Sequence, residues 1–382
     1  MEAMGGTAPD LLTASFLSMQ SPSTVVAFTR EVGGGFVTPF AQRFFLDKCF
    51  NNEVHLRYPA SQSYVKRVVK AIIMAAESDR EEVMEDLYGL HSIFLDLDKG
   101  SPLAERCYTT LTFVLPESAR ANLTQTLGPE MASDLIGTKL LTVRTSLNML
   151  DGDTGYNIWP AGLFLAQVLL SHPQLVHGRS CIELGSGTGI CGIWLSMLAP
   201  SKAVLTDGAL PTLANLRHNL DINGIPISDK ATHVQEARHG ETSVECRQLL
   251  WETASEEELL SFRAQVILGA DLIYDPTIVP HLVRVLAMML QEKSPSRQGL
   301  SAGSDSDEAK ASKSEDDEVL APAAYIASAL RNLTTLHLFF KLADSAGLEV
   351  TDVTEPLMPL RILPEIYDWD RSQIRFYKVV SP

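Results

Sequence analysis

The feature that most constrains this chain is a short apolar strand followed by a glycine-rich loop and a helix. The strand is predicted at residues 180–184, and the loop reads Glu183-Leu184-Gly185-Ser186-Gly187-Thr188-Gly189. A helix is predicted over residues 190–198. Glycines suit such a loop because a cofactor can lie against bare backbone, where a Cβ atom would collide. The free N–H groups at the start of the helix add binding groups, so the segment predicts a cofactor site.

From about residue 161 onward, predicted strands and helices alternate. The strands are expected at 203–206, 244–249, 266–269 and 325–330, and the helices at 161–170, 211–220, 256–262, 279–290 and 333–346. Strands separated by helices of this length favour a parallel, doubly wound α/β sheet. The last two strands, 348–353 and 373–380, have only a loop between them and could form an antiparallel hairpin at the edge. Seven strands that end in this way are typical of the Rossmann-like class I methyltransferase sheet.

The N-terminal third has a different pattern. Residues 1–37 are expected to be flexible apart from a short helix near 11–19, and residues 38–135 to form a mostly helical domain. Apolar residues recur there at spacings of three and four, which indicates helices with one buried face. The residues of that pattern are Phe40, Phe44, Phe45, Val65, Val68, Val69, Ile72, Ile73, Val83, Leu87 and Leu90.

Short strands, rich in Thr, Val and aromatic residues, are predicted at 108–115 and 140–145. Residues 136–382 are assigned to the cofactor-binding domain. A stretch at about 293–321 is rich in Ser, Asp and Glu and almost lacks large apolar residues. We expect it to be a disordered acidic insertion, because it cannot bury enough surface to offset its ordering entropy.

Composition narrows the class of protein. The formal net charge of -16 argues against a general binder of nucleic acid or anionic membranes. The five cysteines are widely spaced and include no CxxC pair, which argues against a disulfide framework or a zinc site and favours a reducing, cytoplasmic compartment. No Lys or Arg precedes Arg30, so no secretory or transit signal is expected, and no apolar run has the length of a membrane span.

The glycine loop alone leaves the cofactor open. Gly187-x-Gly189-x-x-Gly192 also fits the dinucleotide fingerprint. Glu183, just before the first glycine, would repel a pyrophosphate but could hold the α-ammonium group of S-adenosylmethionine. Asp207 ends the next strand, where it could bind ribose hydroxyls of either cofactor. Together these residues favour S-adenosylmethionine.

Four further residues are candidates for the site. Trp159 lies before the first strand of the sheet and Trp251 follows a later strand, where an indole could pack on the cofactor. Taken singly, each Trp is more often a core residue. Asp271 and Tyr274 follow the apolar strand at 266–268, and functional residues of open α/β sheets gather at such strand ends. Asp271 could instead be an N-cap for the following turn.

These residues resemble those of the seven-strand protein lysine methyltransferases, the family that includes the elongation factor 2 lysine methyltransferase. The resemblance covers about 38–292 and 322–380. It rests on TGYNIWPAG around Trp159, ELGSGTG at 183–189, Thr206-Asp207, Leu249-Leu250-Trp251 and Asp271-x-x-Tyr274, and upstream on segments 40–45 and 58–64. The chain departs from the family in its acidic insertion and in Leu250, where an acidic residue often precedes the Trp.

The resemblance implies a protein-lysine N-methyltransferase with S-adenosylmethionine as cofactor and elongation factor 2 as protein partner. It places Asp271 and Tyr274 where the target lysine enters. The expected cofactor contacts are Trp159, Glu183, Gly185, Ser186, Gly187, Gly189, Asp207, Trp251 and Ala270. Two alternatives remain from the residues alone: an NAD-type oxidoreductase and a catalytically silent adaptor that binds S-adenosylmethionine.

Overall fold

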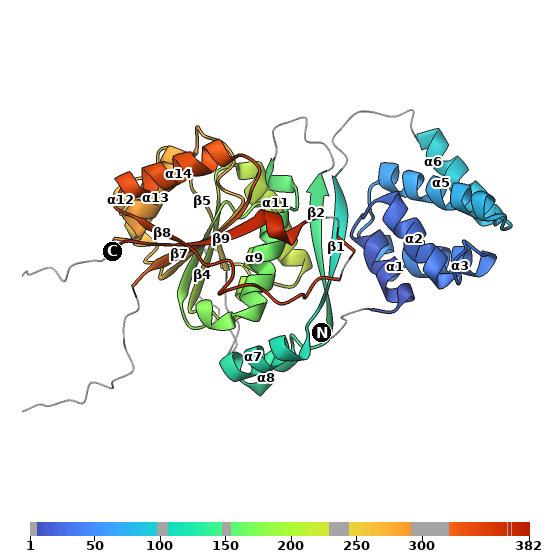
Figure 1. Cartoon of the computed structure of the whole chain (residues 1–382), viewed down its shortest axis with the longest axis horizontal. Coiled ribbons are helices and arrows are strands. Elements are labelled where there is room, and N and C mark those ends of the chain that lie inside the picture. Colours follow the sequence, from blue (N-terminus) through green and yellow to red (C-terminus); the bar gives the residue numbers. More distant parts are fainter. Residues whose placement is uncertain are drawn as a thin grey trace, which may run out of the picture.

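The computed structural model describes residues 6–97, 106–146, 154–228, 244–291, 321–364, 366–367 and 369–382. Figure 1 shows an N-terminal group of helices at one end and a seven-stranded sheet at the other, with a two-stranded hairpin between them. The predicted insertion at 293–321 lies, except for its last residue, outside the described residues. It falls between helix α13 and strand β7.

The large sheet has the strand order β5-β4-β3-β6-β7-β9-β8. Neighbouring strands are parallel from β5 to β7, whereas β9 is antiparallel to both β7 and β8. This confirms the expected class I methyltransferase sheet. The strands are β3 (Ser180–Leu184), β4 (Lys202–Asp207), β5 (Val244–Gln248), β6 (Val266–Ala270), β7 (Ala323–Ala329), β8 (Glu349–Asp352) and β9 (Ile374–Val380).

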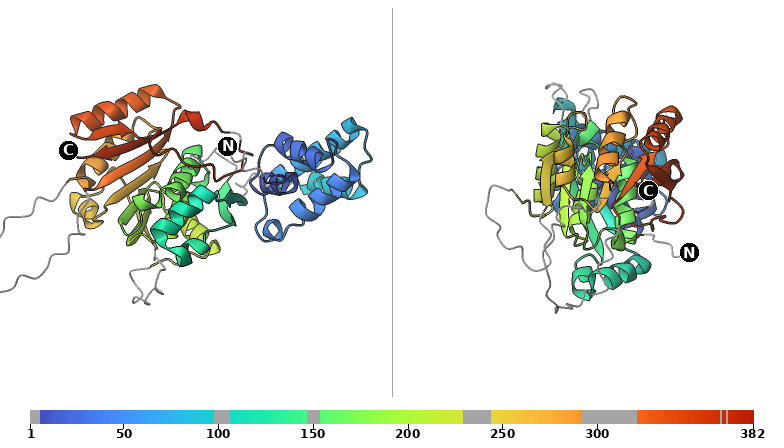
Figure 2. Two further views of the ribbon diagram at one scale, coloured as in Figure 1. Left: turned by 60° about the horizontal axis from the view of Figure 1, so that its bottom comes forward. Right: turned by 90° about the vertical axis from the view of Figure 1, so that its left-hand side faces the viewer.

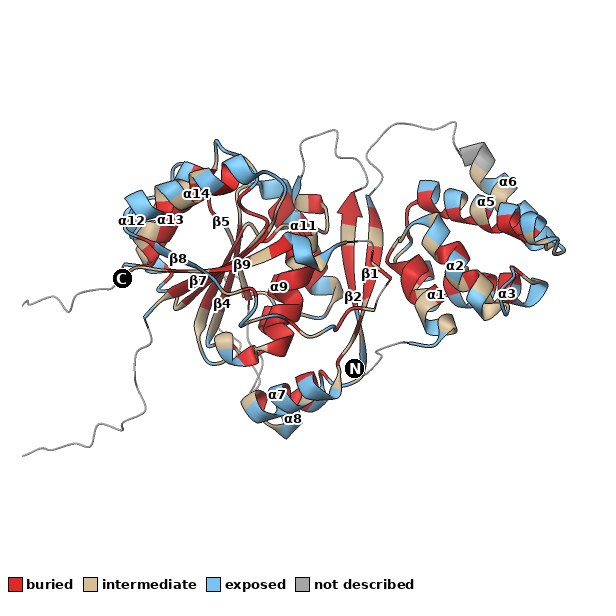
Figure 3. Cartoon of the chain, in the orientation of Figure 1, coloured by how far each residue is buried: buried red, intermediate tan, exposed pale blue. Residues whose placement is uncertain are grey.

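Helices cover both faces of this sheet (Figure 2). One layer contains α9 (Pro160–Ser171), α10 (Ile190–Ser196) and α11 (Leu210–Ile222); the other contains α12 (Glu256–Ser261), α13 (Val279–Met289) and α14 (Leu333–Ser345). Successive residues of β3 face opposite layers: Cys181 packs in one core and Ile182 in the other. Because both faces are covered, the central strands are buried except at their end residues (Figure 3).

The N-terminal unit begins earlier than predicted, because residues 8–32 form two packed helices, of which only a short helix near 11–19 was expected. Leu12, Phe16 and Val25 of these helices are fully buried in the same core as helix α5. Arg30 also makes a two-pronged ion pair with Asp79, with N–O distances of 2.9 and 2.8 Å. The unit comprises α1 (Ala8–Leu17), α2 (Pro22–Val32), α3 (Pro39–Phe44), a π-helical segment (Phe45–Phe50), α4 (Glu53–Arg57), α5 (Gln62–Asp79) and α6 (Glu85–Leu97).

The expected aromatic stripe is only partly buried. Phe45 is fully buried, but Phe40 is 68% exposed, so the two do not share one buried face. The regular spacing in α5 is a better guide, since Val65, Val68 and Ile72 all lie in the core. A periodic pattern is more informative over an eighteen-residue helix than over the six residues of α3.

Strands β1 (Arg106–Val114) and β2 (Thr138–Ser146) form an antiparallel pair, joined through α7 (Glu117–Leu127) and α8 (Pro129–Ser133). Residues of this hairpin, including Phe113 and Val143, share one core with α9, α10 and α11. The domain boundary predicted at residue 135 therefore divides a structural unit. By packing, the described part of the unit that contains the seven-stranded sheet begins at β1.

Three asparagines spaced four residues apart, two on α11 and Asn223 at its C-cap, bond β2 to the main domain. The Asn219 Oδ1 atom accepts a hydrogen bond from the backbone N–H of Arg144 at 2.8 Å, and its Nδ2 donates to the Thr188 carbonyl at 2.9 Å. Asn215 and Asn223 bond the same strand. Because Thr188 belongs to the glycine loop, Asn219 links that loop to the hairpin.

Replacing Asn219 with Ala is expected to lower the free energy of unfolding by about 2–3 kcal/mol. The change leaves one buried N–H donor and one carbonyl acceptor unsatisfied, which costs roughly that amount. Urea denaturation measures the loss. The matched control is Asn122→Ala, whose exposed side chain donates to the Ser171 carbonyl and whose loss should cost about 1 kcal/mol or less. Equal losses in both variants would contradict this role of Asn219.

Candidate active site

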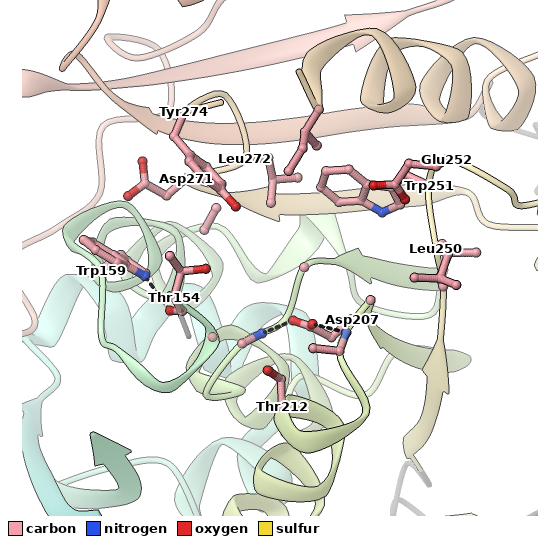
Figure 4. A pocket seen from close by; sticks show the side chains of 18 of the residues that line it. Thr154, Trp159, Asp207, Thr212, Leu250, Trp251, Glu252, Asp271, Leu272 and Tyr274 are labelled. Atoms are coloured by element: carbon pink, nitrogen blue, oxygen red, sulfur yellow. Dashed lines mark hydrogen bonds between the residues drawn. The ribbon is translucent and has the colours of Figure 1, made fainter. Parts of the chain in front are cut away.

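A cavity of about 380 Å³ lies at the carboxyl ends of the central strands (Figure 4). This is the size of a small-molecule site and the place where open α/β sheets bind ligands. It is lined by the loop after β3, the end of β4, the segment after β5, the end of β6 and the turn before α9. The predicted residues that it brings together are Trp159, Gly185, Gly187, Asp207, Trp251, Ala270, Asp271 and Tyr274.

The glycine loop presents bare backbone to this cavity. Gly185 has φ of +62°, and a Cβ atom there would lie 2.9 Å from the Cδ2 atom of Leu272. Because glycine has no Cβ atom, the space beside this backbone stays open for a cofactor that lies against the chain. Gly189 lies elsewhere: it lines neither this cavity nor its small neighbour, and a Cβ atom there would collide with Leu216 at 2.3 Å. The structure therefore gives Gly189 a packing role, and its position lends no support to the predicted cofactor contact.

Asp207 stabilises the glycine loop by a hydrogen bond to its backbone. Its Oδ2 atom accepts a hydrogen bond from the Gly187 N–H at 3.2 Å, and Oδ1 accepts one from the Ala209 N–H at 3.0 Å. Its side chain also lines the cavity, as Figure 4 shows. The predicted contact with ribose hydroxyls is therefore compatible with its position at the end of β4.

Glu183 and Ser186 lie behind the loop, in a smaller cavity of about 50 Å³ that shares Trp159, Gly185 and Gly187 with the larger one. Burial raises the pKa of the Glu183 carboxyl to about 8. A Cβ atom on Gly192 would lie 3.1 Å from Glu183 Oε2 and only 2.4 Å from Leu205. Gly192, the last glycine of the dinucleotide pattern, is thus required for packing of α10 on the sheet.

Replacing Glu183 with Gln is expected to flatten the pH dependence of stability. Because the folded pKa of about 8 lies above the ordinary carboxyl value of 4.5, the folded protein holds a proton that the unfolded chain releases. Stability contributed by this group is present below pH 4.5, falls as pH rises, and levels off above about 8.

Urea denaturation of the parent and of Glu183→Gln between pH 5 and 9 tests this prediction. The advantage of the Gln variant over the parent should grow with pH up to about 8. A constant difference between the two proteins across that range would show that Glu183 is ionised in the folded state throughout.

The two tryptophans face the cavity from opposite sides (Figure 4). The Trp159 indole N–H donates to the Thr154 carbonyl at 3.0 Å, and both indoles are half-buried. A Cβ atom on Gly185 would lie 3.8 Å from Trp251, so that indole borders the bare part of the loop. Trp194, by contrast, is buried in the core.

Asp271 is held in an uncommon backbone conformation directly after β6. Its φ is +60°, its N–H donates to the Ala327 carbonyl at 2.8 Å, and its side chain is 7% exposed. Its carboxylate forms an ion pair with Arg331. Burial raises the pKa of Asp271, and the Arg331 charge opposes that rise. Asp275, rather than Asp271, accepts the capping hydrogen bond of the next turn, from Thr277 N–H at 2.8 Å.

Tyr274 stands at the mouth of the cavity and is 45% exposed. Sequence reasoning did not single out Arg331, Thr154 or Gly155 as site residues, although all three line the wall. Arg331 follows β7, so the rule that singled out Asp271 at the end of β6 could have found it. No sequence pattern predicts the contact between Arg331 and Trp159, because the two residues are far apart along the chain.

Comparisons with known proteins agree with this geometry. Residues 140–308 match the family model described as lysine methyltransferase. Protein-lysine N-methyltransferase EEF2KMT from Homo sapiens is 25% identical over 80% of this chain and 77% of its own length. The Mus musculus protein of the same name is 29% identical over 54% and 55% of the two chains. Protein-lysine N-methyltransferase EFM3 from Chaetomium thermophilum is 31% identical over 58% and 62%.

Residues 140–308 are thus similar to the lysine methyltransferase family. This similarity favours S-adenosylmethionine over NAD as the cofactor of the glycine loop. The chain spans between about half and three quarters of the length of the relatives above. None of the described helices has the length and hydrophobicity needed to cross a membrane.

Proposed function

We propose that this protein transfers a methyl group from S-adenosylmethionine to a lysine side chain of another protein, and that the acceptor is elongation factor 2. The observation that carries the proposal is the buried Asp271, which shares one cavity with the bare glycine loop. The acceptor identity rests on the family resemblance and on relatives named as protein-lysine N-methyltransferases. A cytoplasmic location fits this acceptor and the five cysteines, all of them described residues and none of them in a disulfide.

The residues of the cavity suit such a reaction. S-adenosylmethionine supplies an electrophilic methyl group, and the attacking lysine must be neutral and aligned with it. Gly185, Gly187, Asp207 and the two tryptophans would hold the cofactor. Asp271 receives and orients the incoming ammonium, which releases one proton to solvent before transfer, while Tyr274 packs along its aliphatic stem.

Free lysine has a pKa of about 10.4, and desolvation in a narrow site favours its neutral form. No strong general base is therefore required. Most of the catalysis is then alignment of the amine with the methyl group, a task for side chains fixed at the ends of β-strands.

The test is incubation with S-adenosylmethionine labelled at the methyl group and purified elongation factor 2, followed by peptide mapping of the label. Label on a lysine supports the whole proposal. Label in proteins of a cell extract but not in elongation factor 2 would remove only the acceptor. Tight binding of S-adenosylhomocysteine without transfer to any protein would favour the silent adaptor instead.

A further inference from the structure

Arg331 joins two parts of the site that come from distant segments of the chain. It lies just beyond β7, and its guanidinium pairs with the carboxylate of Asp271. The same guanidinium stands 4.7 Å from the centre of the Trp159 ring, on its face. One side chain thus contacts both the residue expected to receive the lysine and an indole expected to border the cofactor.

Asp271 needs such a partner because its surroundings disfavour a negative charge. Its side chain is almost completely buried, and burial alone favours the neutral acid. The other charged groups in the cavity wall, Asp207 on β4 and Glu252 after β5, are both acidic. The titratable neighbour Tyr274 is a phenol. Among the described residues that line this cavity, Arg331 is the one that carries a positive charge.

We propose that Arg331 is a positioning residue, which keeps Asp271 ionised and aimed at the acceptor lysine and holds Trp159 in place beside the cofactor. This inference rests on the proposed function, because it assigns Asp271 the task of receiving the lysine. Arginine suits both contacts. Its guanidinium is charged at every working pH, and its plane can stack on an indole while its edge bonds a carboxylate.

The first test compares kcat/KM for the protein acceptor, as a function of pH, in the parent, Arg331→Gln and Arg331→Lys. In Arg331→Gln the positive charge is lost, and the acid limb of the kcat/KM pH profile should move upward by about one to three pH units. Arg331→Lys keeps the charge, so its acid limb should stay near that of the parent. A lysine side chain cannot stack on Trp159 as arginine does. The affinity of the Arg331→Lys variant for S-adenosylhomocysteine should therefore fall roughly threefold.

Arg375→Gln is the matched control, since it removes an arginine from an exposed pair with Asp352 outside the cavity. Its acid limb should coincide with that of the parent. An Arg331→Gln limb that also coincides with the parent limb would overturn the inference, whatever the loss in rate.

A second arm needs no turnover. The stability lost in Arg331→Gln, measured by urea denaturation, should be largest above neutral pH and shrink as pH falls and Asp271 takes up a proton. In an Asp271→Asn background the same substitution should have an effect that does not vary with pH. If the parent transfers no methyl group, the proposed function fails, and this arm still decides whether Arg331 controls the charge of Asp271. If Arg331→Gln lowers the stability of the protein that keeps Asp271 by the same amount at every pH, Arg331 does not control the charge of Asp271.

Discussion

Replacing Asp271 with Asn is expected to reduce methyl transfer at least about 100-fold while changing the affinity for S-adenosylhomocysteine by about twofold or less. Asparagine has nearly the same volume and tolerates a φ of +60°, so the turn after β6 should persist. The variant loses the charge that would receive the lysine ammonium. Steady-state kinetics with the protein acceptor and calorimetry with S-adenosylhomocysteine measure the two effects separately.

Asp275→Asn is the matched control for this substitution. Asp275 lies in the same loop, but it is partly exposed and its carboxylate caps the turn at Thr277. An Asn there can still cap the turn, so activity should remain close to that of the parent. An Asp271→Asn variant with parental turnover would remove Asp271 from the mechanism.

Replacing Gly185 with Val is expected to weaken binding of S-adenosylhomocysteine at least about 100-fold, because a branched side chain would fill the space in which the cofactor must lie against the backbone. The new Cβ would lie 2.9 Å from Leu272, and the position has a φ of +62° that valine disfavours. Calorimetry measures the affinity, and circular dichroism shows whether the variant is folded.

Gly347→Val separates backbone strain from obstruction of the cavity. Gly347 has a φ of +73°, a Cβ atom there would meet no neighbouring atom within 4 Å, and the residue lies outside the cavity wall. This variant should lose stability but bind S-adenosylhomocysteine as the parent does. Similar loss of binding in both variants would mean that strain, not obstruction, explains the effect at Gly185.

The sheet could be predicted closely from the sequence. The strand predicted at 180–184 coincides with β3, and the helix after the glycine loop begins at Ile190 as expected. Both faces of these strands are covered, so they read as short continuous apolar runs between helical segments. The positions of Asp207 and Asp271 at strand ends followed directly from those boundaries.

The N-terminal helices and the pairing within the site could not be predicted in the same way. A short helix near 11–19 was expected, but not its burial: Ser15 of α1 bonds the Leu12 carbonyl of the same helix, and its polarity masked a buried face. The Thr7–Asp10 capping box and the Ser21 N-cap were signals that such helices begin there. The Arg331–Asp271 pair depends on the adjacency of β6 and β7, which is a property of the folded sheet.

The decisive measurement is the identity of the amino acid that receives the methyl group. Cell extract is incubated with the protein and labelled S-adenosylmethionine, and its proteins are hydrolysed and separated as amino acids. We expect label in methylated lysine with the parent protein, and almost none with Asp271→Asn or Gly185→Val. Label in another amino acid, or equal labelling by the parent and Asp271→Asn, would contradict transfer to lysine at this site.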